Sequence, residues 1–239
     1  ASDGAAGDRF SNSVAISDDY LIVGAVLDDD NGDHSGSAYV FERSGGTWIE
    51  VTKLTASDGA AEDFFADSVA ISDNYAIVGV SLDDDNGDNS GSAYVFERSG
   101  GSWAEVAKLA ASDGSGEDRF GTSVATNNGN VLVGANRADG KGTDSGAVYV
   151  FLRTGSTWNQ VAKLTPSDGS DEDFFGNSVA ISGNYAMLGA YWDDNNGLTD
   201  PGAAYGFSLD QDGDGLFDYR EDAIGTDPYD ADSDTDDMP

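Results

Sequence analysis

The sequence predicts an all-β fold, a β-propeller-type array of four-stranded blades followed by a C-terminal calcium-loop tail. Three observations predict it. The motif Ser-Val-Ala recurs four times at a spacing of 55 residues, with its valine at Val14, Val69, Val124 and Val179. Each unit holds short runs rich in Val, Ile, Tyr, Phe and Trp, separated by Gly, Asp, Asn and Ser. No unit carries the pattern of a long helix, and repeated four-stranded units of this length are typical of propeller blades.

The strands of the first unit can be placed in order. We expect them over Ser13–Ser17, Tyr20–Ala25, Ser37–Arg43 and Trp48–Thr55. The second run is almost entirely apolar, as expected for a strand that is buried on both faces. The fourth run is interrupted by polar residues and therefore fits an outer strand.

The four units give predicted blades over approximately 11–55, 66–110, 121–165 and 176–207. The first three supply four strands each and the last supplies three. Either four blades close a small ring with one unpaired edge, or they form part of a larger ring. We expect the last blade to be completed by residues outside this sequence, since an open strand edge is a docking site for another chain.

Two short motifs in the later units resemble a known family. Phe120-Gly121 and Phe175-Gly176 are each followed by Ser-Val-Ala and then by Val133-Gly134-Ala135 or Leu188-Gly189-Ala190. This pattern resembles the FG-GAP repeats of integrin α-chain propellers and their bacterial relatives, over about residues 8–207. The resemblance implies a domain over 1–207. The calcium loop of integrin-type repeats has no counterpart here, because a short turn stands in its place.

A twelve-residue segment after the last unit has the spacing of a calcium loop. Oxygen-bearing side chains occupy loop positions 1, 3, 5, 9 and 12, Gly215 stands at position 6, and position 7 offers a backbone carbonyl. Glycine permits the sharp bend, and calcium takes six to eight oxygen ligands. The predicted ligands are Asp210, Asp212, Asp214, Leu216, Asp218 and Glu221.

A second acidic stretch follows this loop. Its candidate ligands are Asp230, Asp232, Asp234 and Asp236. Together the two stretches resemble the thrombospondin type 3 repeats of bacterial surface proteins, over residues 208–239. The tail has little apolar material, so we expect calcium binding to supply its folding energy.

Further acidic runs lie between the second and third strands of the units. In a propeller these connections share one face with the links between blades, so the array would be electrically one-sided. Concentrated like charge destabilises a compact chain unless cations offset it. Calcium in these loops, with ligands Asp28, Asp30, Asp83 and Asp85, is one interpretation; ordinary Asp/Asn/Gly turn chemistry is the other.

Composition limits the partners. The 239 residues carry a formal net charge of −34, which argues against nucleic acid and anionic membranes. Only eight of the 45 acidic residues are Glu, and the Asp bias fits placement in loops. There is no cysteine and no apolar run long enough to span a membrane, and we expect no signal peptide within these residues.

The residue inventory argues against an enzyme. The single histidine, His34, lies in an acidic loop where the next unit has Asn89, so we interpret it as a surface variant. No phosphate-binding or dinucleotide-binding motif occurs. The recurring Trp48, Trp103 and Trp158 indicate packing, whereas Trp192 departs from the repeat.

We therefore expect a non-enzymatic, calcium-binding adhesion or assembly module of a secreted or cell-surface protein. Its partner would be a protein or glycan surface, or further copies of itself. Two alternatives stay open: a carbohydrate-binding or carbohydrate-active propeller, and a self-assembling structural subunit of a filament or matrix.

Overall fold

A computed structural model describes residues 1–127, 129–194 and 200–209. These residues form fifteen strands in four antiparallel sheets, each sheet ordered as its strands follow in the chain. The first sheet holds β1 (Phe10–Ser17), β2 (Tyr20–Ala25), β3 (Ser37–Ser44) and β4 (Thr47–Leu54). The second holds β5 (Ser68–Ser72), β6 (Tyr75–Val80), β7 (Ser92–Ser99) and β8 (Ser102–Leu109).

The third and fourth sheets repeat the plan. The third contains β9 (Phe120–Asn127), β10 (Asn130–Ala135), β11 (Ala147–Thr154) and β12 (Thr157–Leu164). The fourth contains β13 (Phe175–Ser182), β14 (Tyr185–Ala190) and β15 (Ala203–Ser208). The all-β prediction of four blades, the last with three strands, is confirmed for the described residues. None of them forms a helix able to cross a membrane.

The apolar second run of each unit lies in the middle of its blade. Ile22, Ile77 and Leu132 are fully buried there. β2 pairs with β1 on one side and β3 on the other, with Val23 opposite both Val14 and Tyr39. The outer strand pairs with the third strand through a bulge, between Val40 and Phe41 in the first blade. In the second and third blades this strand also has a blade on each face, and burial of that kind selects an apolar sequence, as predicted.

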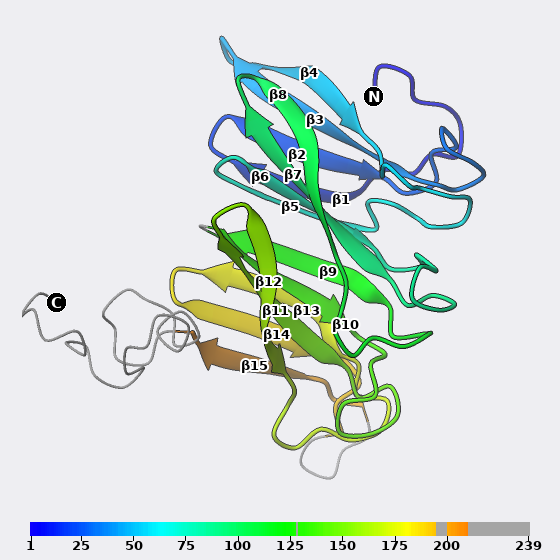
Figure 1. Cartoon of the computed structure of the whole chain (residues 1–239), viewed down its shortest axis with the longest axis vertical. Helices are drawn as coiled ribbons and strands as arrows, with labels where there is room; N and C mark the ends of the chain where they lie inside the picture. The colour runs from blue at the N-terminus through cyan, green and yellow to red at the C-terminus, as the bar shows by residue number, and fades with distance from the viewer. Residues whose placement is uncertain (128, 195–199, 210–239) are drawn as a thin grey trace, which may run out of the picture.

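Blades pack face to face in chain order. One apolar cluster joins the first and second blades, a second joins the second and third, and a third joins the third and fourth. Among the described residues no such cluster joins the fourth blade to the first. Figure 1 shows β4 at the top of the array and β15 at the bottom, with the inner strands β1, β5, β9 and β13 following one another between them. Within the part of the chain that the structure describes, the four-bladed arrangement therefore has two free end faces.

Main-chain contacts join each blade to the next. Gly36 pairs with Phe65 through an isolated parallel bridge, and Gly91 with Phe120 and Gly146 with Phe175 do the same. The amide of each phenylalanine donates to the residue before the glycine, as Phe65 does to the Ser35 carbonyl at 3.0 Å. The glycines have positive φ, and a Cβ would lie about 2 Å from the facing carbonyl oxygen (2.1 Å at Gly36). Only glycine permits this approach.

The phenylalanine of each bridge precedes the second residue of the FG motif. Gly121 and Gly176 have φ of 96° and 86°, which explains why glycine occurs there. Ser11 and Ala66 replace it in the first two units and still adopt φ of 76° and 71°. The repeat thus preserves this conformation even where the side chain disfavours it.

Candidate functional site: the acidic loop face

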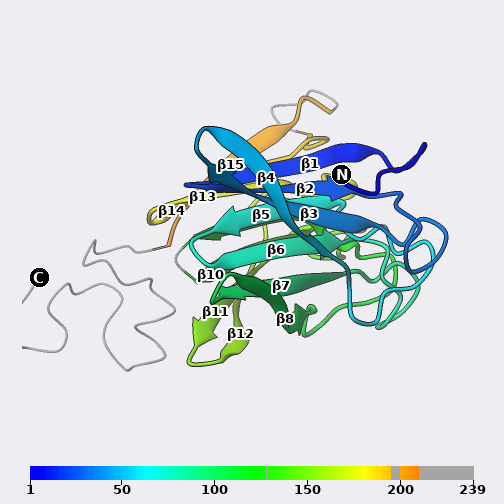
Figure 2. The ribbon, with the colours of Figure 1, turned by 90° about the horizontal axis from the view of Figure 1, so that it is seen from above.

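The connections between second and third strands, and the links between blades, gather at one end of the sheets. Figure 2 shows the loops of the first two blades together at this end, on the side of the N-terminus, with the tight hairpins at the other. The Ser-Asp-Gly link before each blade folds back onto that blade's outer strand, where Ser2 bonds to Glu50 and Ser57 bonds to Glu105. The link therefore delivers its aspartate to the blade's own loop.

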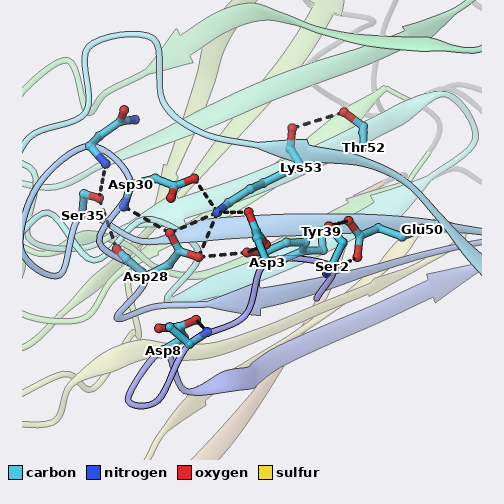
Figure 3. Close-up of polar contacts among 12 residues, drawn as sticks. Ser2, Asp3, Asp8, Asp28, Asp30, Ser35, Tyr39, Glu50, Thr52 and Lys53 are labelled. Carbon is cyan, nitrogen blue, oxygen red and sulfur yellow. Dashed lines mark hydrogen bonds and ion pairs between the residues drawn. The ribbon is translucent and has the colours of Figure 1, made fainter.

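A lysine ammonium lies at the centre of these loops in the first blade. Lys53 Nζ of β4 lies 3.0 Å from Asp3, 3.0 Å from Asp28 and 2.5 Å from Asp30 (Figure 3). The Tyr39 hydroxyl of β3 lies 2.7 Å from the Asp3 carboxylate and 2.8 Å from that of Asp28. Asp28 is 4% exposed, so its charge is neutralised inside the protein by this ammonium, and the hydroxyl hydrogen-bonds to the same carboxylate.

The second blade builds the same cluster. Lys108 Nζ lies 2.9 Å from Asp58 and 2.8 Å from Asp83, and it also contacts Asp85. Tyr94 supplies the hydroxyl, 2.6 Å from Asp58 and 3.1 Å from Asp83. The two clusters are related by the repeat, and in both the lysine also lies over the tyrosine ring, at 5.1 and 5.0 Å.

The third and fourth blades each lack a part of the cluster. Ala138 stands where the repeat has Asp28 and Asp83, so Lys163 pairs with Asp113 at 2.7 Å and with no second carboxylate in the described chain. In the fourth blade the Tyr205 hydroxyl contacts Asp168 and the buried Asp193. None of the residues described there supplies an ammonium.

The charges in these clusters shift the pKa of their carboxyl groups. Burial by itself raises the pKa of Asp28, but hydrogen bonds from Lys53 and Tyr39 outweigh it and bring that pKa below its ordinary value. The same balance lowers the pKa of Asp58. For Asp113 the hydrogen bond from Lys163 is the largest cause, and its pKa is also lowered.

The lowered values predict how stability depends on pH. Carboxyls with a lowered folded pKa stabilise the protein above their unfolded pKa of about 3.9, and that contribution is lost as pH falls through the folded pKa. We expect the free energy of unfolding to fall steeply below about pH 4. Burial raises the pKa of Asp63 and of Asp118. These two carboxyls destabilise the folded protein at neutral pH, and this cost becomes smaller as pH falls toward about 4. Urea unfolding at several pH values measures this, and an unchanged midpoint between about pH 5 and about pH 3 would contradict it.

The four blade-loop residues predicted to bind calcium are thus brought together in two groups of two. Asp28 and Asp30 share Lys53, and Asp83 and Asp85 share Lys108. The ammonium supplies positive charge where the sequence-based interpretation placed a cation, so calcium at these residues requires the lysine to move. Calcium there stays a prediction. The candidate ligands Asp210, Asp212, Asp214, Leu216, Asp218, Glu221, Asp230, Asp232, Asp234 and Asp236 lie outside the described residues.

The comparisons with known proteins bear on this architecture. The FG-GAP repeat model matches residues 1–41, 48–96, 103–151 and 158–215, more than half of the chain. The chain belongs to the FG-GAP repeat family. No curated protein matches it. Among solved structures, Saccharomyces cerevisiae Sqt1 is similar at 12% identity and a TM-score of 0.48, over 84% of this chain and 50% of that one. The chain therefore spans about half the length of that protein.

The second aspartate of each FG-GAP loop closes the loop. The Asp29 carboxylate accepts a hydrogen bond from the amide of His34 at 2.8 Å, and that of Asp84 accepts one from the amide of Asn89 at 2.7 Å.

The ligand atoms of Asp29, Asp33 and His34 all lie within 4.8 Å of one another, on the exposed side of the first loop. His34 also stacks on Phe64 and lies 3.4 Å from Glu62. These contacts make His34 part of the link between the first and second blades.

A cavity of about 300 Å³ opens beside the incomplete third cluster. Lys163, Arg137, Asp113, Asp118 and Asp139 contribute to its lining. The cavity lies where the repeat lacks the buried aspartate, and its walls carry both signs of charge.

Trp192, the tryptophan that departs from the repeat, packs against Phe174 and Tyr191, so local packing accounts for its presence.

Sequence reasoning missed the clustered lysines of this FG-GAP chain. Lys53, Lys108 and Lys163 recur at the 55-residue spacing, as do Tyr39, Tyr94 and Tyr149. That recurrence was the available signal, because polar residues that repeat together with buried aspartates point to a shared cluster. The aspartates of the links were also missed as cluster members, since 50 residues separate Asp3 from Lys53.

Proposed function

We propose that this chain is a non-enzymatic, calcium-binding adhesion or assembly module of a secreted or cell-surface protein. FG-GAP repeats are typical of extracellular or surface proteins. The observation that supports a scaffold most directly is the lysine cluster repeated at the loop face. Its buried carboxylates are committed to lysine and tyrosine partners, which rigidifies the loops and leaves their exposed acids to face a partner.

Calcium enters this proposal chiefly through the predicted tail. The loop that begins at Asp210 offers the spacing of a calcium site, and the cation would offset part of the net charge of −34. The exposed group of Asp29, Asp33 and His34 offers a weaker second location. A tail stiffened by calcium would set the distance between the propeller and whatever follows it.

We expect removal of calcium by a chelator to affect the tail and the blades differently. We expect EDTA to raise amide exchange rates in residues 210–221 by at least about tenfold while the blade strands stay protected, because metal binding supplies the tail's folding energy. Hydrogen exchange followed by mass spectrometry, with and without millimolar calcium, measures it. Equal exchange of the tail in both conditions would refute the calcium part of the proposal.

The carbohydrate alternative needs a separate test. A glycan array combined with a hydrolysis screen, both run with calcium present, distinguishes a sugar-directed propeller from a protein-directed scaffold. We expect no turnover of any glycoside, and repeated turnover that is lost on replacing one acidic side chain would overturn the non-enzymatic assignment.

A further inference from the structure

The contact between neighbouring blades has a repeated side-chain part. In the first contact, Arg98 of the second blade lies over the Tyr20 ring of the first blade, at 4.2 Å from its centre, and donates to its hydroxyl at 3.1 Å. Trp103 packs edge-on against the same ring at 6.1 Å. We call this arrangement of Tyr, Arg and Trp the inter-blade clamp. It forms again between the next two blades, where Arg153 lies over Tyr75 and Trp158 packs against it.

The two free ends of the array each carry one half of a clamp. Tyr185 of the last blade corresponds to Tyr20 and Tyr75, and it is 68% exposed. Arg43 and Trp48 of the first blade correspond to Arg98 and Trp103. Arg43 is already held by Asp19, at 2.7 Å, much as Arg98 is held by Asn74 at 2.6 Å.

The apolar surfaces at the ends follow the same rule. Val14 and Ile16 of β1 are 63% and 67% exposed. Val69 and Ile71 occupy the same positions in the second blade, where they pack against the first blade and are each only 7% exposed. At the other end Met187 is 53% exposed, whereas Ile22 and Ile77 are fully buried. Each end therefore exposes side chains whose counterparts are buried at the contact between the first and second blades.

The main-chain bridge between blades joins a glycine of one blade to a phenylalanine of the next. The residues that correspond to these two partners lie unbridged at the two ends of the described array. Phe10 corresponds to Phe65 and is 40% exposed, whereas Phe65 is 1% exposed. Gly202 corresponds to Gly36 and Gly91 and keeps a φ of 72°. A Cβ at Gly202 would meet only atoms of its own blade, so the described chain provides no strand beside it.

From this complementarity we infer that two copies of the chain bind head to tail. The last blade of one copy stacks on the first blade of the other, with Arg43 and Trp48 closing on Tyr185 and Met187 covered by Val14 and Ile16. The contact is heterologous, so the copies either close into a ring or add further copies to form an open filament. Cation–π pairing and apolar burial both contribute, as they do between blades. This inference deepens the assembly role proposed above and rests on it.

Blocked-end variants test the inference on the full chain. Ile16→Asp places a charge on the first-blade end, and Met187→Asp places one on the last-blade end; both positions are exposed, so folding survives. We expect sedimentation velocity to show concentration-dependent association of the unmodified chain, weakened about thirtyfold or more in each variant alone. An equal mixture of the two variants recovers a dimer, because one intact pair of ends remains. Val106→Asp, at an exposed position of β8, is the matched control and leaves association unchanged.

Three outcomes would overturn the inference: a monomer at every concentration, association insensitive to both variants, or a variant mixture that stays monomeric. The measurements are made at about 0.15 M salt, where the Debye length of about 8 Å screens repulsion between acidic copies. Running them with and without calcium keeps the two proposals apart. A chain that stays monomeric but binds calcium would contradict only the head-to-tail contact. A chain that assembles but does not bind calcium would contradict only the calcium proposal.

Discussion

Replacing Gly91 by alanine is expected to lower the free energy of unfolding by about 2–5 kcal/mol. Gly91 forms the main-chain bridge between the second and third blades, with a φ of 78°. A Cβ there would lie 2.0 Å from the Phe120 carbonyl oxygen and 2.6 Å from its amide nitrogen. The facing atoms are backbone, so relief requires the two blades to separate. Urea unfolding monitored by tryptophan fluorescence measures the loss.

Gly101→Ala is the matched control for this substitution. Gly101 has a φ of 86°, but a Cβ there would have open space around it. It therefore reports only the cost of a side chain at positive φ, about 1 kcal/mol. The difference between the two variants isolates the contact between blades. Equal losses would show that the bridge does not hold the blades together.

Replacing Lys108 by methionine is expected to lower the free energy of unfolding by about 2–3 kcal/mol. Breaking a buried ion pair costs about 3–5 kcal/mol, and the figure is reduced here because Asp58 and Asp85 are exposed to screening solvent. The cost arises from Asp83, which is left charged at 5% side-chain exposure. Adding Asp83→Asn should restore part of the stability, and millimolar calcium should restore part of it in the single variant. Urea unfolding provides the comparison.

Lys163→Met offers a control in the same fold. Ala138 removes the buried aspartate from the third blade, so Lys163 has one carboxylate partner, the half-exposed Asp113. We expect a loss of about 1 kcal/mol or less. If the two lysine variants lose equal stability, the buried aspartate is not what the lysine neutralises, and the account of the cluster is wrong.

The repeat spacing was enough to predict the sheets and their order. Apolar runs such as Tyr20–Ala25 could be placed because burial on both faces leaves a direct imprint on the sequence. The clusters were harder to predict, because their members come from three separate segments: Asp3 in the link, Asp28 in a loop and Lys53 in the outer strand. Only the path of the loops brings them together. A bound cation is one of the two interpretations that the sequence leaves open for the acidic loops, and in two blades a lysine provides positive charge there.

The openness of the array could not be read from the repeats either. Val14 and Val69 occupy the same position of the repeat, yet one is exposed and the other is buried. Sequence patterns report the environment for which a side chain is suited, whereas its actual environment depends on whether a neighbour is present. The comparison of equivalent residues in successive blades is what identifies the end faces.

Calorimetric titration of the full chain with calcium chloride measures calcium binding itself. We expect measurable binding heat and a rise in melting temperature, both reduced when Asp212 and Asp214 are replaced by asparagine. Asp73→Asn, the same change in a tight turn outside the predicted sites, should leave both signals intact. An unmodified chain that gives neither heat nor a thermal shift with millimolar calcium would contradict calcium binding by this protein.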